Sequence, residues 1–244
     1  MTDATLLEVD GLRKAFGRVV VADELTFSVA PGEAVGIVGP NGAGKTSLLN
    51  LITGTLRPDG GRVVLDGTPI ERLPAHARAR LGIGRTYQVP RPFSGMTVFE
   101  NVVLGSIAAG RLRGRAADEA AVEALARSGL LDRANVLAGS LTLLDRKRLE
   151  LARALAVRPR VLLLDEIAGG LTEAETTLLA TEIAALRSEG VTILWIEHVV
   201  HALLSVVDRL IATNFGRMLI DGEPRAVMAS PSVQAVYLGE GVEV

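Results

Sequence analysis

The residues with the clearest chemical potential form a glycine-rich loop that fits the phosphate-binding pattern G-x-x-x-x-G-K-[ST]. Glycines in such a loop allow consecutive backbone N–H groups to close around an anion at the positive end of a helix. Lys45 would then reach the outer phosphates of a nucleotide, and the Thr46 hydroxyl would bind Mg²⁺. The loop and the serine that follows it comprise Gly39, Pro40, Asn41, Gly42, Ala43, Gly44, Lys45, Thr46 and Ser47.

The segments on either side place this loop where a phosphate site requires it. Residues 33–38 are short and mostly apolar, which predicts a buried strand, and residues 46–53 predict a helix that stops at Gly54. The alternative is a glycine-rich turn that happens to contain a lysine. The strand, loop and helix in this order favour the phosphate loop.

A second set of reactive side chains follows two later strands. Residues 161–164 are a continuous apolar run, typical of a central parallel strand, and Asp165 and Glu166 come directly after it. Open α/β sheets bind ligands at this end of their strands. Asp165 would hold Mg²⁺ through water, and Glu166 would polarise the attacking water. His198 follows the next predicted strand, 191–196, where it can hydrogen-bond a γ-phosphate.

One segment has a superficial likeness to a zinc motif. Residues 197–201 contain a glutamate and two histidines, but their order is E-H-x-x-H instead of the H-E-x-x-H of zinc proteases. We therefore expect no metal at this segment.

The composition is that of a globular protein with one sizeable core. The chain has 244 residues, 48% of them hydrophobic, a net charge of -2 and no cysteine. A nucleic-acid-binding protein usually has a clear basic excess, so we expect no nucleic acid partner. The start of the chain lacks a signal-peptide pattern, and charged residues interrupt its most apolar region, residues 191–213, so we expect no membrane span.

The order of predicted elements indicates an α/β fold. We expect a phosphate-loop NTPase core, with a mostly parallel sheet flanked by helices, together with an antiparallel β subdomain and a helical subdomain. In a single domain spanning 1–244, residues 1–88 and 158–244 would form the core with the antiparallel subdomain, and residues 89–157 the helical subdomain. The predicted strands are 6–9, 19–21, 25–29, 33–38, 62–67, 83–87, 161–164, 191–196, 210–213 and 218–220, and the predicted helices are 46–53, 74–81, 98–107, 116–128, 145–157, 172–190, 224–229 and 233–238.

Over essentially its whole length the sequence resembles the ATP-binding-cassette (ABC) ATPases. The loop 39–46 matches their Walker A loop, 161–166 the Walker B strand with its catalytic glutamate, Gln88 the Q-loop, and His198 the switch histidine. Within the family it is most similar to the ATP-binding subunits of branched-chain amino-acid importers, although amide and urea importers share much of the pattern. The segments that carry this similarity are 85–88, 96–101, 148–154 and 236–239.

The resemblance also implies how the nucleotide and its metal are held. Phe16 would stack on the adenine ring, and Gln88 would join Thr46 and Asp165 around Mg²⁺. From the residues alone, a single phenylalanine beside a strand can equally well belong to the core. Both alternatives for Phe16 therefore stay open at the level of sequence.

The same resemblance implies the activity and the partners. Lys45, Glu166 and His198 would carry ATP hydrolysis. Two ATP-binding subunits would dimerise head to tail around two ATP molecules and act on two membrane permease subunits, which in turn work with a periplasmic binding protein. The chain would then sit peripherally on the cytoplasmic side of the inner membrane.

The sequence departs from the family at the signature Leu-Ser-Gly-Gly-Gln, which in the family contacts the other subunit's γ-phosphate. This chain has Leu141, Thr142, Leu143, Leu144 and Asp145 at these positions. Thr142 can cap the following helix, with Asp145 returning the bond as in a capping box. However, Asp145 places negative charge at a helix N-terminus, and the leucines remove glycines that permit close backbone approach.

A second departure lies after the catalytic glutamate, where Gly169–Thr172 replaces the family's Ser-Ala-Leu-Asp. Both departures face the partner subunit in the family. One hypothesis is an asymmetric heterodimer, in which a partner with an intact signature completes this chain's site and the site built on 141–145 turns over slowly. The alternative is a tolerated variant that works normally in a homodimer.

Two other functions remain possible from the sequence. One is a non-transport cassette ATPase acting on nucleic acid or ribosomes, but the chain lacks the long coiled coil or second cassette that is usual there. The other is a regulatory nucleotide-binding subunit with weak turnover, against which the intact Lys45, Asp165, Glu166 and His198 argue. A transport ATPase is therefore the preferred interpretation.

Overall fold

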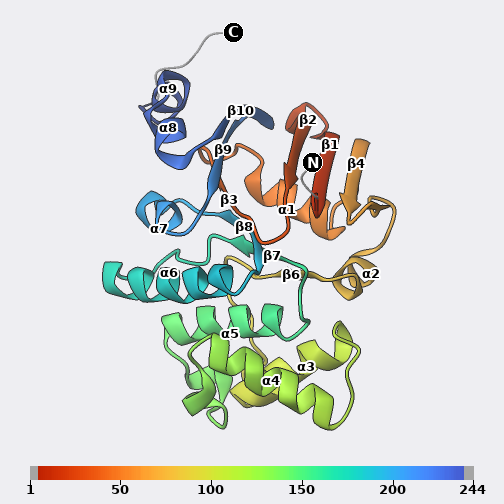
Figure 1. The fold of residues 1–244 in the computed structure, drawn as a ribbon, viewed down its shortest axis with the longest axis vertical. Helices are drawn as coiled ribbons and strands as arrows, with labels where there is room; N and C mark the ends of the chain where they lie inside the picture. Colours follow the sequence, from red (N-terminus) through yellow and green to blue (C-terminus); the bar gives the residue numbers. More distant parts are fainter. Residues whose placement is uncertain (1–4, 239–244) are drawn as a thin grey trace.

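The computed structural model describes residues 5–238, and the strands of this part of the chain lie in two sheets (Figure 1). Residues 1–4, where we expected no signal peptide, and Gly239 of the importer-like C-terminal segment lie outside the described residues. No helix in the described part of the chain is long and apolar enough to cross a membrane.

The larger sheet has the strand order β10-β9-β3-β8-β7-β6, and every neighbouring pair except β10–β9 is parallel. Strands β3, β7 and β8 are buried along their whole length, as their continuous apolar sequences predict. Because they run parallel, their carboxyl ends meet at one edge of the sheet. The bounds are β3 (Ala34–Val38), β6 (Ile83–Arg85), β7 (Val161–Asp165), β8 (Thr192–Ile196), β9 (Arg209–Asn214) and β10 (Arg217–Gly222).

The smaller sheet is antiparallel, in the order β2-β1-β4-β5. It packs with helix α1 against one face of the larger sheet. Side chains of β3 alternate accordingly: Val35 and Ile37 face the core on this side, while Ala34 and Val38 face the core on the other. The bounds are β1 (Leu7–Phe16), β2 (Val19–Val29), β4 (Gly60–Leu65), β5 (Thr68–Pro69) and α1 (Lys45–Thr53).

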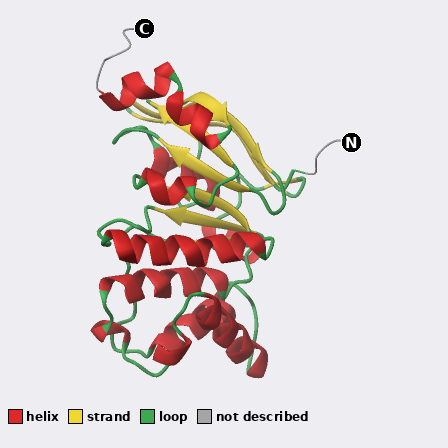
Figure 2. Cartoon of the chain, turned by 60° about the vertical axis from the view of Figure 1, so that its left-hand side comes forward, coloured by secondary structure: helices red, strands yellow, loops and turns green. Residues whose placement is uncertain are grey.

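Helices between β6 and β7 form the lower part of the molecule, where Figure 2 shows helices joined by loops and no strand. Their buried alanines and leucines pack against each other and join the core below the larger sheet. Thr97 begins the first of these helices with a capping box to Glu100. The bounds are α3 (Val98–Ala108), α4 (Arg115–Arg127) and α5 (Leu143–Leu155), with 3₁₀ turns η1 (Leu131–Arg133) and η2 (Ala138–Ser140).

Five further helices cover the sheets. The capping box predicted for Thr172 and Glu175 is confirmed: Thr172 N donates to Glu175 Oε2 at 2.9 Å, and Glu175 N donates to Thr172 Oγ1 at 3.3 Å. The bounds are α2 (Ala75–Arg80), α6 (Glu173–Ser188), α7 (Val200–Leu204), α8 (Pro224–Ala229) and α9 (Pro231–Leu238).

The first strands differ from the prediction. The two strands expected at 19–21 and 25–29 are one continuous strand, β2, because Glu24 adopts a left-handed conformation (φ 55°) and the pairing with β1 shifts register instead of ending. For the same reason β1 continues to Phe16, which we had placed between strands. Strand β6 ends at Arg85, two residues earlier than expected.

A buried arginine fastens α1 to α2. Arg78 is 1% exposed, and its guanidinium donates to the backbone oxygens of Leu51 at 2.6 Å and Ile52 at 2.9 Å, near the end of α1. It also donates to the carbonyls of Leu73 and Glu71. Burial lowers the pKa of Arg78, a shift that the charge of Glu71 opposes. The side chain thus satisfies carbonyls that a helix end leaves without partners.

We expect Arg78→Met to lower the free energy of unfolding by about 2–3 kcal/mol, because it leaves several buried carbonyls without donors. Arg80→Met is the matched control, since Arg80 lies in the same helix and is exposed. Urea denaturation of both variants measures the difference. Equal losses would contradict the role given to Arg78.

Candidate active site

The glycine-rich loop connects β3 to α1, as predicted, and two neighbouring strands hold it closely. A Cβ on Gly39 would lie 2.3 Å from the Thr213 carbonyl of β9, and one on Gly44 would lie 2.1 Å from the Val21 carbonyl of β2. Gly44 also has φ 89° and begins α1 without a side-chain cap or an acidic residue in the first turn. The positive end of α1 is therefore open to an anion.

Lys45 lies across its own loop. Its side chain is buried, and Nζ donates to the Gly39 carbonyl at 2.7 Å and to the Pro40 carbonyl at 2.9 Å. Burial lowers the pKa of Lys45, and the charges of Glu166 and Asp165 oppose that shift. The ammonium group is thus held at the loop, where phosphate oxygens can replace the carbonyls.

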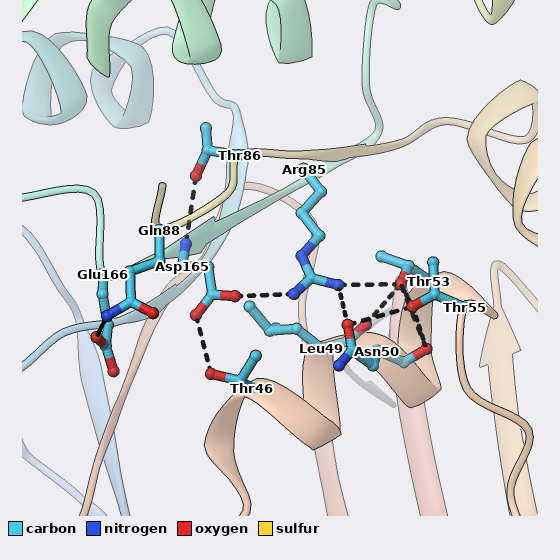
Figure 3. A network of polar contacts seen from close by, with 10 residues as sticks. All are labelled: Thr46, Leu49, Asn50, Thr53, Thr55, Arg85, Thr86, Gln88, Asp165 and Glu166. Carbon is cyan, nitrogen blue, oxygen red and sulfur yellow. Dashed lines mark hydrogen bonds and ion pairs between the residues drawn. The ribbon is translucent and has the colours of Figure 1, made fainter. Parts of the chain in front are cut away.

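The ends of β7 and α1 bring Asp165 and Thr46 together, as the sequence predicted. Thr46 Oγ1 lies 3.4 Å from Asp165 Oδ1, and the Asp165 side chain is 2% exposed. Its other oxygen, Oδ2, accepts from Arg85 Nη2 at 2.8 Å (Figure 3). Sequence reasoning missed Arg85 as a functional residue, although it lies in one of the segments with family resemblance.

Two side chains that the sequence assigned to other roles contact the Glu166 carboxylate. Gln88 Nε2 donates to Oε2 at 2.5 Å, and His198 Nε2 lies 2.6 Å from Oε1. Gln88 was expected at the metal and His198 at the γ-phosphate. In the structure Gln88 lines one cavity of about 510 Å³ together with Thr46 and Asp165, although its amide bonds Glu166.

Phe16 lies on the surface, so the core alternative is wrong. The residue is 53% exposed, and Lys14 Nζ lies 5.4 Å from the centroid of its ring. Phe16 pairs with Val19 at the turn between β1 and β2, and Val19 lines a cavity of about 430 Å³ over the glycine-rich loop. An aromatic ring is therefore exposed beside the loop.

A buried lysine of α5 reaches the same site and was not predicted to do so. Lys147 is 2% exposed, and its Nζ donates to the backbone oxygens of Gln88 at 2.6 Å and Glu166 at 3.4 Å. Burial lowers its pKa, opposed first by the charge of Glu197 and then by that of Glu166. The only sequence signal was the rarity of lysine, which the chain keeps at three positions.

Glu197 has a structural role beside the site. The residue is 1% exposed, and its carboxylate accepts from the backbone N–H groups of Ala168 at 3.0 Å, His198 at 2.9 Å and Val199 at 3.4 Å. These bonds hold the backbone that carries His198. The carboxylate thus orders the turn after β8.

The unusual segment 141–145 begins α5, and one prediction for it is wrong. Thr142 Oγ1 accepts from Asp145 N at 3.2 Å, but Asp145 does not return the bond. Its carboxylate lies instead within ion-pair distance of two arginines, 3.6 Å from Arg148 and 3.9 Å from Arg133, whose positive charges attract it away from the backbone. The capping box is therefore only half formed.

The leucines of this segment divide between core and surface. Leu141 and Leu144 are buried, whereas Leu143 is 42% exposed. The Leu143 side chain lies next to Gly170 of the second unusual segment: a Cβ added to Gly170 would be 3.3 Å from it. The two departures from the family pattern are therefore neighbours in space.

Comparison with known proteins decides the family. The family model described as "ABC transporter" matches residues 22–169. The chain belongs to the ABC transporter family. It is 40% identical to the high-affinity branched-chain amino acid transport ATP-binding protein BraF of Pseudomonas aeruginosa, over 96% of this chain and 98% of BraF. It is 38% identical to the protein of the same description, LivG, of Escherichia coli, with the same coverage.

Solved structures agree with this assignment. An ATP-binding cassette of an ABC transporter in its ADP conformation has a TM-score of 0.89 and 30% sequence identity, covering 96% of this chain and 99% of that one. This chain is thus an ATPase subunit with the phosphate-loop NTPase fold, as the sequence predicted.

We expect Gly44→Ala to abolish nucleotide binding, because its methyl group would meet the Val21 carbonyl and push the loop out of place. Gly67→Ala is the control: Gly67 lies outside the loop, between β4 and β5, and has a similar φ of 72° but nothing within 4 Å of a Cβ, so only backbone strain of about 1–2 kcal/mol is expected. Titration with a fluorescent ATP analogue tests both. Binding by Gly44→Ala as tight as by Gly67→Ala would refute the packing constraint.

Proposed function

We propose that this subunit hydrolyses ATP to drive the import of branched-chain amino acids or a related amide or urea. The observation that carries the substrate class is its 40% and 38% identity, over nearly full length, to two transport ATP-binding proteins described for branched-chain amino acids. The site geometry supports the hydrolysis and does not itself select a transported molecule.

Mg²⁺ and ATP fit the groups that converge at the loop. Thr46 and Asp165 offer a hydroxyl and a carboxylate 3.4 Å apart, and oxygen donors of this kind suit Mg²⁺. Gln88 lies beside them as a further oxygen donor once its amide leaves Glu166. When bound, the metal would neutralise charge on the phosphates. Residues 39–47 would cradle the phosphates, and Phe16 would stack on adenine.

Glu166 is the group that we propose acts on the attacking water. Its carboxylate is held from both sides by Gln88 and His198, which fixes its orientation. When ATP enters, His198 would turn to the γ-phosphate, and Glu166 would accept a hydrogen bond from water aligned with the scissile bond. Lys45 would stabilise the charge that develops on the outer phosphates.

A groove between the sheet and the helices of the lower part supports the proposal that membrane permease subunits dock here. A cavity of about 570 Å³ lies between α2 and β6 on one side and α3 and α5 on the other. Tyr87 and Phe93 are about half exposed there, at 49% and 51%, and their apolar faces would fit a helix of a membrane protein. This docking would keep the subunit at the cytoplasmic face of the inner membrane.

The second subunit of the dimer is, in our proposal, a different chain. The exposed Leu143 covers the surface beside Gly170, and the Asp145 carboxylate lies in the first turn of α5. Both oppose a close approach of phosphate to this helix. A partner with a glycine-containing signature would complete the site of this chain, whereas the partner's own site, closed by residues 141–145, would turn over slowly.

To test the transport function, the subunit is assembled with its permeases in vesicles, and ATP hydrolysis is measured with and without a leucine-loaded periplasmic binding protein. We expect stimulation by leucine, and Glu166→Gln should lower turnover about a hundredfold or more through loss of the carboxylate. Glu173→Gln, at an exposed acid of the next helix, is the control. A rate of ATP hydrolysis that is the same with and without the permeases and the binding protein would contradict a transport role. Stimulation only by an amide or urea would reassign the substrate.

The asymmetry has a single-site test in the same assembled transporter. Glu166→Gln in this chain should remove most turnover, and the matching change in the partner subunit should remove little. Both measurements use the same vesicles and the same ATP concentration. Equal losses, or assembly of an active homodimer of this chain alone, would show that 141–145 is a tolerated variant.

A further inference from the structure

The guanidinium of Arg85 lies at the centre of a buried polar network behind the glycine-rich loop. Its side chain is 5% exposed and comes from the last residue of β6. Nη2 donates to Asp165 Oδ2 at 2.8 Å, and Nη1 donates to Asn50 Oδ1 at 2.7 Å (Figure 3). One planar group thus bridges the end of β7 and the middle of α1.

This bridge controls the direction of the Asp165 carboxylate. Because Arg85 occupies Oδ2, the other oxygen, Oδ1, faces Thr46. If Arg85 were removed, Oδ2 would be buried without a donor, which is costly for a charged group. The carboxylate would relieve that cost by rotating toward another donor, and Oδ1 would then leave Thr46.

The position of α1 depends on the same group. Asn50 Oδ1 also accepts from Thr55 Oγ1 at 3.2 Å, and Arg85 Nη1 lies 3.3 Å from Thr53 Oγ1. The network therefore joins the middle of α1, the helix that carries Thr46, to Thr53 and Thr55 at and just beyond the C-terminal end of that helix. The fork of an arginine is suited to this task because it donates in two directions at a fixed angle.

Arg85 also lies at the groove proposed for membrane subunits. Its Cζ is 4.9 Å from the centroid of the half-exposed Tyr87 ring, and Arg85 lines both cavities of this region. A group docked against Tyr87 is therefore one side chain away from Asp165.

We propose that Arg85 is a positioning residue that orients Asp165 toward Thr46 for Mg²⁺ binding. The inference rests on the proposed nucleotide site, and it goes beyond the family comparison because it assigns a role to a side chain outside the loop and the acidic pair. A purely structural arginine would stabilise the fold without affecting the metal.

The test measures metal binding directly on the full chain. Electron paramagnetic resonance follows free Mn²⁺ as it binds in the presence of a non-hydrolysable ATP analogue, and fluorescence measures the affinity for the analogue in EDTA. Arg85→Met should weaken Mn²⁺ binding by about tenfold, as expected for an outer partner of a metal ligand, and should leave metal-free nucleotide affinity unchanged.

Arg78→Met is the matched control, since Arg78 is also a buried arginine near α1 but donates its hydrogen bonds to backbone carbonyls, away from Asp165. It should lower stability without weakening Mn²⁺ binding. Unchanged or tighter Mn²⁺ binding in Arg85→Met, or the same weakening in Arg78→Met, would overturn the inference.

If Arg85→Met does not fold, a conservative variant tests the same inference. Arg85→Lys retains one charged donor for Asp165 but cannot also reach Asn50, so Mn²⁺ binding should weaken by a smaller factor than in Arg85→Met. Unchanged binding in Arg85→Lys would refute the need for the bridge. A wild-type chain that bound nucleotide but no Mn²⁺ would refute the proposed metal site itself, and the inference with it.

Discussion

Parallel pairing of β3, β8 and β7 is the constraint on which the rest of the structure depends. In register, Ile37 of β3 lies opposite Ile196 of β8, and Ile196 lies opposite Asp165 of β7. The three strands therefore end together, and the glycine-rich loop, the acidic pair and His198 lie at or directly after these ends. Residues more than a hundred positions apart in the chain meet because hydrogen-bonded strands leave no freedom in where they end.

The second constraint is the balance of buried charge around this edge. The cations Lys45, Arg85 and Lys147 each contact backbone oxygens or a carboxylate, and the buried Asp165 and Glu197 each have donors of their own. A buried charge without such partners would be strongly unfavourable. The site can therefore hold several buried charged groups, because each has a partner that offsets the free-energy cost of removing it from water.

The unusual segment 141–145 affects the surface of the molecule and leaves this charged interior intact. Leu141 and Leu144 join the core, and Asp145 pairs with Arg148, so the start of α5 is well packed within the subunit. What changes is the exposed face of that helix, where Leu143 stands beside Gly170. The sequence of residues 141–145 can therefore change the surface of the subunit without disturbing the buried charges beside the glycine-rich loop.

The sequence by itself determined the features that depend on local order. The spacing from Gly39 to Thr46, the apolar run before Asp165 and the capping pair Thr172 and Glu175 all act within a few residues of chain, so their types and order sufficed to predict them. The long helices of the lower part followed from periodicity in the same way. The first strands were less well predicted, because the register shift at Glu24 depends on the pairing partner.

Only the tertiary structure decided which distant side chains meet. Nothing in the spacing of the many arginines distinguishes Arg85, which reaches Asp165, from Arg78, which fastens two helices. Likewise, Lys147 reaches the backbone of Gln88 and Glu166 only because α5 packs beneath the sheet. The sequence predicted that Asp145 caps α5, but in the structure its carboxylate lies near Arg133 and Arg148 instead. These contacts arise from packing between elements far apart in the chain, so they cannot be predicted from a local pattern of residues.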